Sequence, residues 1–211
     1  MSFNVLATAA HFDDAELGCG GTLARHVRAG DKVFLYVATR SNYRDMKEKE
    51  VRSAETALKE GQRAAKILGA RLIEGPFATF HLQYDDRLVS TVRRIIEEKK
   101  IDTVYLPWTG DVHQDHRAMA RSTITAARHC PRILMYPINY YDSEETFDPR
   151  HFVDVSKTMP AKLSAIRAHA SEMRRTKGKW IEHAEAQGRI HGIKMGTRYA
   201  EAFQAVRYLA P

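Results

Sequence analysis

Residues 4–21 read NVLATAAHFDDAELGCGG, an apolar run that passes directly into a histidine, two aspartates and a group of glycines. A short apolar run that is ended abruptly by polar residues predicts a buried strand. Charged side chains at the end of a buried strand are unfavourable unless another group pairs with them. The stretch therefore requires a partner for His11, Asp13 and Asp14.

Strand-like and helix-like segments alternate along the rest of the chain. Further short apolar runs occur at 32–39, 71–74, 103–107, 132–137 and 151–155. The segments between them favour helices at 20–29, 46–69, 86–100 and 116–129. This alternation predicts an α/β fold, with a mostly parallel β-sheet flanked by helices on both faces. A helical, basic C-terminal segment is expected from residue 157, with a short helix or strand at 199–208.

Length and composition are those of a globular protein. We expect one domain, 1–211, because 211 residues with 44% apolar and 28% charged content suffice for a single core. The longest apolar run, at 33–38, is far shorter than the roughly 20 residues of a membrane span, so no membrane span is expected. The first strand begins by Asn4, which leaves no room for a leader peptide. A cytoplasmic protein is therefore expected.

Cysteines and charges narrow the choice of partners. With only Cys19 and Cys130, a disulfide framework is not expected, and any metal must be held by histidine and carboxylate. The net charge of +7 lies mainly in 157–198, which holds ten Lys or Arg against three Glu. No base-reading motif or aromatic platform accompanies this basic segment, so no nucleic-acid partner is expected.

Two polar motifs each follow a predicted strand. His11 and Asp14 lie three residues apart after the first strand, and His113 and His116 lie three apart in WTGDVHQDH, after the strand at 103–107. In a parallel sheet the loops after the strands open onto the same edge. Two imidazoles and a carboxylate are a common ligand set for catalytic zinc. His11, Asp14 and His116 supply that set.

Three further side chains of these motifs have no obligatory ligand role. Asp13, His113 and Asp115 remain beside the expected metal, and a spare carboxylate near a metal-activated water meets the requirement for a general base. The density of aspartates in both loops also demands a cation, because like charges held close together destabilise one another. A divalent metal is therefore the expected partner of the first motif.

The glycines have a separate function. Gly18, Gly20 and Gly21 are expected to permit close backbone approach and a tight turn into the helix that follows. Their spacing is not the G-x-G-x-x-G of a dinucleotide site, and acidic residues precede them. No nicotinamide cofactor is therefore expected.

The two motifs together resemble a known family. AHFDDAELGCGGTLA and DVHQDH are similar to the signatures A-H-P-D-D-x-E and H-x-D-H of the PIG-L/LmbE-like zinc-dependent N-deacetylases (N-acetylglucosaminyl deacetylases). Further similar segments lie at 60–70, 84–88, 152–156, 162–171 and 199–203. The resemblance implies a Rossmann-like sheet and an enzyme that hydrolyses the amide of an N-acetylglucosamine-type group, releasing acetate and a free amine. The implied cofactor is Zn²⁺, with another divalent metal such as Fe²⁺ as the alternative.

The resemblance also implies roles for the site residues. It gives His11, Asp14 and His116 as metal ligands and Asp13 as the catalytic base. His113 is implied to stabilise the oxyanion, and Asp115 to orient His113 and keep it protonated near neutral pH.

Substrate contacts follow the same resemblance. Asp85 matches a family aspartate near the sugar, although an N-terminal helix cap is an equally good interpretation. Independently of the resemblance, Tyr140 and Tyr141 are expected to form a wall of the sugar pocket by stacking, and subunit contact is an equally good interpretation of such loop tyrosines. The implied partner is a small N-acetylated sugar conjugate, and a homo-oligomer is typical of relatives. Two positions depart from the family: Phe12 replaces a proline, and Ala57 stands where many relatives have a substrate-holding arginine.

Two other functions remain open from the sequence. An amidase that cleaves a larger acyl or thiol-conjugate amide would use the same metal. A non-catalytic sugar- or nucleotide-binding protein with a Rossmann-like fold is the second alternative, although it would have no need of the base Asp13.

Overall fold

A seven-stranded sheet forms the centre of the molecule in the computed structural model, which describes residues 2–138 and 140–210. Its strand order is β5-β2-β1-β6-β7-β9-β8. The parallel strands are β1 (Asn4–Ala9), β2 (Lys32–Thr39), β5 (Arg71–Phe77), β6 (Thr103–Pro107) and β7 (Arg132–Tyr136). Antiparallel pairing adds β9 (Ala200–Tyr208) and β8 (His151–Asp154). The prediction of a mostly parallel sheet is confirmed.

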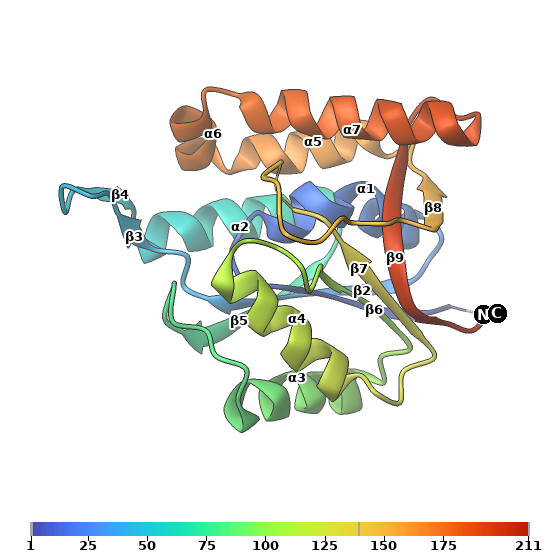
Figure 1. Cartoon of the computed structure of the whole chain (residues 1–211), viewed down its shortest axis with the longest axis horizontal. Coiled ribbons are helices and arrows are strands. Elements are labelled where there is room, and N and C mark those ends of the chain that lie inside the picture. The colour runs from blue at the N-terminus through green and yellow to red at the C-terminus, as the bar shows by residue number, and fades with distance from the viewer. Residues whose placement is uncertain (1, 139, 211) are drawn as a thin grey trace.

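Helices cover both faces of this sheet (Figure 1). One face carries α1 (Asp14–Arg28) and α2 (Ala54–Leu68), and the other carries α3 (Asp86–Lys99) and α4 (Gln114–Ala126). The C-terminal helices α5 (Met159–Ala168), α6 (Ala170–Thr176) and α7 (Lys179–Met195) lie over α1 and α2 as a further layer. Two apolar clusters result, one on each side of the sheet. Among the described residues, no helix is long and apolar enough to cross a bilayer.

The first helix begins earlier than predicted. α1 starts at Asp14 rather than near residue 20, so the glycines lie inside the helix and do not form a turn. At two of these positions the glycine nevertheless allows neighbouring side chains to approach the helix backbone closely, as predicted. A Cβ at Gly18 would overlap the ring of Tyr136, and a Cβ at Gly21 would crowd Val155. The helix can therefore pack tightly against its neighbours only because these side chains are missing.

The second helix begins later than predicted. α2 starts at Ala54, with Ser53 as its N-cap accepting the backbone N–H of Thr56 at 3.1 Å. The residues before it form a small hairpin of β3 (Tyr43–Arg44) and β4 (Glu50–Arg52). Gly69, in the left-handed conformation, ends α2 as predicted. The hairpin matters for function because its last residue reaches the candidate site.

The C-terminal segment is helical, as expected from residue 157. Its last helix, α7, spans a glycine-containing stretch, and the carbonyl of Arg198 lies where a Cβ of Gly192 would project. Residues 200–208 form a strand, β9. Glu201 on β9 pairs with buried Lys162 at 2.6 Å and accepts the N–H groups of Gly21 and Thr22. This buried carboxylate ties the antiparallel strand to α1 and α5.

Candidate metal site and catalytic cleft

The two polar motifs meet at the carboxyl edge of the sheet. β1 and β6 are hydrogen-bonded neighbours, with Val5 opposite Thr103 and Ala7 opposite Tyr105. Each strand is followed by a short loop and then by the N-terminus of a helix, α1 or α4. The loops 10–13 and 108–113 therefore lie side by side although about a hundred residues separate them in the chain.

The metal-binding atoms of the predicted ligands lie close to one another. His11 Nδ1 lies 3.2 Å from His116 Nε2, which is also 3.2 Å from Asp14 Oδ1. His11 Nδ1 is 3.7 Å from Asp14 Oδ2. Donors bound about 2.1 Å from a tetrahedral zinc are roughly 3.4 Å apart, so this spacing fits a shared cation. The ligand set of two nitrogens and one carboxylate oxygen suits zinc or another divalent transition metal.

His113 lies within the same cluster but in a different arrangement. Its donor nitrogen and those of His11 and His116 all lie within 4.8 Å of one another, so three histidines offer an alternative ligand set. However, His113 Nδ1 accepts the backbone N–H of Asp115 at 3.1 Å. Neutral His113 therefore carries its proton on Nε2, where it is a hydrogen-bond donor and has no lone pair for a metal. This favours a role for His113 toward substrate.

Carboxylates lie behind both ligand imidazoles. His11 Nε2 contacts Asp115 Oδ2 at 2.9 Å, and His116 Nδ1 contacts Asp111 Oδ1 at 3.1 Å. Metal-binding histidines usually have such a partner on the ring nitrogen that faces away from the metal. The prediction that Asp115 orients the ring of His113 is wrong in this respect, because the Asp115 carboxylate faces His11. Asp111 was not assigned a role from the sequence, although its place in the second motif was a signal.

The charges of the cluster show its demand for a cation. Burial opposes a charged imidazole, but Asp14 and the carboxylates behind the rings outweigh it and raise the pKa of His11 to about 9 and that of His116 to about 10. In turn, His116 and His11 overcome burial and hold the pKa of Asp14 below its usual value. These carboxylates therefore favour positive charge between the side chains, and a divalent cation would supply it.

His113 differs from its neighbours in charge. Burial, together with the nearby imidazoles of His116 and His11, lowers the pKa of His113 to about 4. The prediction that Asp115 keeps His113 protonated near neutrality is therefore wrong, because burial and two neighbouring rings outweigh the attraction of the carboxylates.

Asp13 is held in a strained conformation at the start of α1. Its φ of 121° lies in the region that side-chain-bearing residues rarely adopt, a type of strain that clusters at functional sites. One carboxylate oxygen accepts a 2.9 Å hydrogen bond from Arg52, which also donates to the carbonyl of Phe12 at 3.0 Å. Burial raises the pKa of Asp13 to about 7, with Arg52 opposing the shift and Asp14 adding to it.

Arg52 links the site to a buried polar network that the sequence did not predict. This arginine is only 3% exposed and also contacts Glu60 at 3.1 Å and His169 Nδ1 at 3.0 Å. It comes from the β3–β4 hairpin, whereas Ala57, the position of the family arginine, is buried and apolar. The absence of an arginine at position 57 was a signal that another residue could contact the site. Nothing in the local sequence, however, indicated that the hairpin would supply an arginine in its place.

The converging side chains lie at the base of a cleft of about 410 Å³. Beyond the metal-site residues and Asp13, its lining comprises Leu17, Ser41, Tyr43, Arg52, Thr79, Phe80, Val112, Gln114, Ile138, Tyr141, Glu172, Arg175 and Trp180. Tyr141 is thus placed at the cleft. Asp85 is not among the lining residues: its carboxylate caps α3 by accepting the N–H of Leu88 at 2.9 Å. Of its two interpretations, the structure shows the helix cap.

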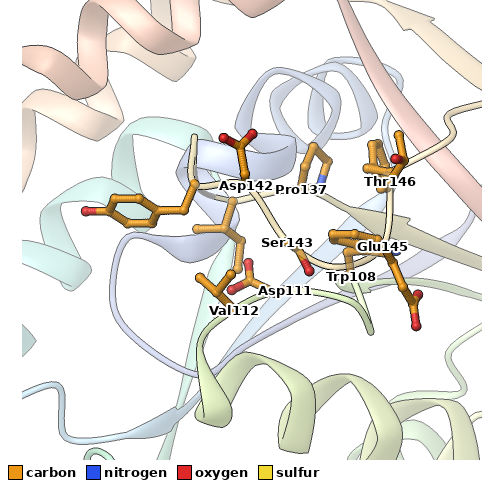
Figure 2. A pocket seen from close by; sticks show the side chains of 11 residues that line it. Trp108, Asp111, Val112, Pro137, Asp142, Ser143, Glu145 and Thr146 are labelled. Carbon is orange, nitrogen blue, oxygen red and sulfur yellow. The ribbon is translucent and has the colours of Figure 1, made fainter.

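A smaller hollow of about 210 Å³ adjoins the cleft. Figure 2 shows Pro137 and Asp142 on the segment after β7, and Asp111 and Val112 on the loop before α4. Val112 and Tyr141 line both spaces. The region around Tyr141 therefore offers room for whatever is attached to a group bound in the cleft.

The departure at Phe12 is accommodated by new contacts. Its N–H donates to Ser41 Oγ at 2.8 Å, a bond that a proline at this position lacks. The ring occupies the space that a Cβ on Gly61 would need. A hydrogen bond therefore holds the backbone of the first motif at Phe12, the position where the family signature has a proline that restricts φ.

Known proteins resemble the chain in both sequence and structure. The family model PIG-L, described as GlcNAc-PI de-N-acetylase, matches residues 6–127. An uncharacterized deacetylase, YaiS, from Escherichia coli is 33% identical over 79% of this chain and 90% of its own length. The diacetylchitobiose deacetylase of Thermococcus kodakarensis is 28% identical over 96% of this chain and 82% of its own. The conserved protein TT1542 from Thermus thermophilus superposes with a TM-score of 0.82, at 26% identity, over 99% of this chain and 97% of its own.

Proposed function

The chain belongs to the PIG-L family of deacetylases, and on this premise we propose that it is a metal-dependent hydrolase that removes the acetyl group from an N-acetylhexosamine unit of a small conjugate. The observation that carries the proposal is the close approach of the His11, Asp14 and His116 side chains, with Asp13 lining the same cleft. The diacetylchitobiose deacetylase among the relatives supports a sugar amide as substrate.

His11, Asp14 and His116 are proposed to hold the cation, with Asp115 and Asp111 fixing the two imidazole rings from behind. A divalent metal bound there would polarise the amide carbonyl and lower the pKa of a water molecule. Zinc is the proposed metal because nitrogen and carboxylate ligands in a three-residue set are typical of catalytic zinc, and Fe²⁺ is the alternative.

Asp13 is proposed to take the proton of the attacking water and to deliver it to the departing amine. Its carboxylate is buried and is held in place by Arg52 at 2.9 Å, so it is aimed before substrate binds. A carboxylate whose pKa lies near 7 is well matched to accept and return a proton near neutral pH.

His113 is proposed to stabilise the oxygen of the amide as that oxygen gains negative charge. The Asp115 N–H occupies Nδ1, so Nε2 donates toward the cleft. A donor fixed in advance needs no reorganisation during the reaction, which makes such groups effective even when they are uncharged. Tyr141, at the edge of the cleft, is proposed to pack against the part of the substrate beyond the sugar.

The test measures acetate and amine release from N-acetylglucosamine and N,N′-diacetylchitobiose, together with the metal content of the purified protein. Asp13→Asn is expected to keep its metal and to lose activity by roughly 10²- to 10⁴-fold. His116→Ala is expected to lose the metal. Adding zinc or Fe²⁺ to chelator-treated protein identifies the metal that restores activity.

Two outcomes would contradict the proposal. Hydrolysis of longer acyl amides with no turnover of acetamides would indicate the amidase. A protein that binds sugar or nucleotide without retaining metal, and whose binding is unchanged in Asp13→Asn, would indicate a non-catalytic binding protein.

A further inference from the structure

Phe80 lies at the mouth of the cleft in an unusual backbone conformation. It belongs to the connection between β5 and α3, and its φ is 65°, in the left-handed region that disfavours residues with a side chain. Both of its peptide groups are held by the second motif: its N–H donates to Asp115 Oδ2 at 2.7 Å, and its carbonyl accepts from Gln114 Nε2 at 3.0 Å. Strain of this kind persists only where the surroundings determine the conformation.

This conformation presents the ring of Phe80 to the cleft. The ring stacks on His113 with centroids 5.7 Å apart and an interplanar angle of 26°, and it lies 6.4 Å from the ring of His11. Tyr43 meets it edge-on at 6.1 Å. Nevertheless, the side chain remains 43% exposed and belongs to neither apolar cluster of the protein. Core packing therefore does not account for its position.

We propose that Phe80 is the surface on which the apolar face of the substrate's pyranose ring packs. This inference rests on the proposed function. An amide whose carbonyl lies between the metal ligands and His113 carries its sugar ring on the nitrogen, within a few ångströms of these side chains. A hexosamine with equatorial hydroxyls presents C–H groups on its ring faces, and a flat aromatic side chain at the edge of the site is a suitable partner for them.

The position of Phe80 links sugar recognition to the metal ligands. The same Asp115 oxygen, Oδ2, accepts both the Phe80 N–H and the His11 Nε2–H. One atom therefore fixes the positions of the Phe80 ring, the proposed platform for the sugar, and of the His11 imidazole, a proposed metal ligand. The distance between the Phe80 ring and an amide bound at the metal site would therefore be fixed. This fixed distance would select substrates whose sugar ring is attached directly to the amide nitrogen.

Three variants and a matched control separate the ring from the backbone. Phe80→Ala and Phe80→Gly both remove the ring, but only glycine is free of strain at a φ of 65°. Phe80→Trp keeps an aromatic face. Tyr84→Ala is the control, because Tyr84 is an aromatic residue of the same connection that is 54% exposed and does not line the cleft.

Each protein is assayed for binding of methyl N-acetylglucosaminide by calorimetry, for hydrolysis of that glycoside and of N-acetylethanolamine, and for metal content. Phe80→Ala and Phe80→Gly are expected to weaken sugar binding and to lower kcat/KM for the glycoside by roughly 5- to 10-fold, mainly through KM. Hydrolysis of N-acetylethanolamine and the metal content should not change, and Phe80→Trp and Tyr84→Ala should resemble the wild type.

Several results would overturn the inference. Equal losses on both substrates, or loss of metal, would show that Phe80 acts only by supporting Asp115. A loss in Phe80→Ala that Phe80→Gly does not share would assign the effect to the backbone. A wild type that binds no sugar also overturns it. Sugar binding that depends on the Phe80 ring without any hydrolysis would instead refute the proposed deacetylase function and leave the platform intact.

Discussion

Replacing Asp115 with asparagine tests how the site is built. The Asp115 carboxylate accepts three N–H groups: His11 Nε2 at 2.9 Å and Phe80 N at 2.7 Å on Oδ2, and Leu82 N at 3.1 Å on Oδ1. An asparagine has only one side-chain oxygen. If that oxygen takes the Oδ2 position, two bonds remain and the amide NH₂ opposes the Leu82 N–H. The reverse orientation loses two bonds, so the first orientation is expected.

The size of the effect follows from these contacts. One N–H group that was bonded to a carboxylate is left without an acceptor, which lowers the free energy of unfolding by about 1–3 kcal/mol. The negative charge behind His11 is also lost, and loss of such an outer partner weakens metal binding by roughly 10- to 100-fold. The catalytic residues Asp13 and His113 remain, so activity at saturating metal should fall less than metal affinity.

Competition with a chromophoric chelator measures the metal affinity of wild type and Asp115→Asn, and urea unfolding of the metal-free proteins measures stability. Asp148→Asn, at an exposed carboxylate paired with exposed Arg150, is the control. A metal affinity within threefold of wild type, in a variant that unfolds normally, would refute the assigned role of Asp115.

The same variant has a defined pH dependence. Burial opposes ionisation of Asp115, but His11 and the N–H groups of Phe80 and Leu82 outweigh it and lower its pKa. A carboxylate with a lowered pKa contributes stability above its unfolded pKa of about 4, and this contribution is lost as the pH falls through the folded pKa. The stability difference between the wild type and Asp115→Asn should therefore shrink in acid.

Further predictions concern metal binding, helix packing and the buried arginine. Metal affinity, measured by chelator competition, should rise from about pH 6 to pH 9. The reason is that protons must leave His11 and His116, whose pKa values are raised to about 9 and about 10, before a metal can bind. An affinity independent of pH would contradict this. Gly18→Ala should lower the free energy of unfolding in urea by about 1–3 kcal/mol, since its methyl group would overlap a buried ring. Gly20→Ala should change it little, because its methyl group would lie 3.4 Å from Lys162 Cγ, in ordinary van der Waals contact. Arg52→Lys keeps the charge but not the fork of donors, so it should lower stability by about 1–3 kcal/mol; stability equal to wild type would show that the network is dispensable.

Much of the fold was readable from local patterns. Short, continuous apolar runs identified the parallel strands, because strands covered by helices on both faces are apolar along most of their length, and the segments between these runs identified α3 and α4. The start of α1 was mispredicted because the glycines were taken as a turn, whereas they allow neighbouring side chains to approach the helix. Glycines also lie inside α7, where Gly188 and Gly192 face packed neighbours.

The sequence by itself determined the chemical groups and their local spacing: His11 and Asp14 three residues apart, and a second histidine pair after another strand. It also indicated the sheet edge where they meet, since parallel strands end on the same side. Only the tertiary structure decided which groups touch. It placed Asp115 against His11, Arg52 against Asp13, and Phe80 at the edge of the cleft. These contacts depend on strand order and loop conformation, which are set by packing between segments far apart in the chain.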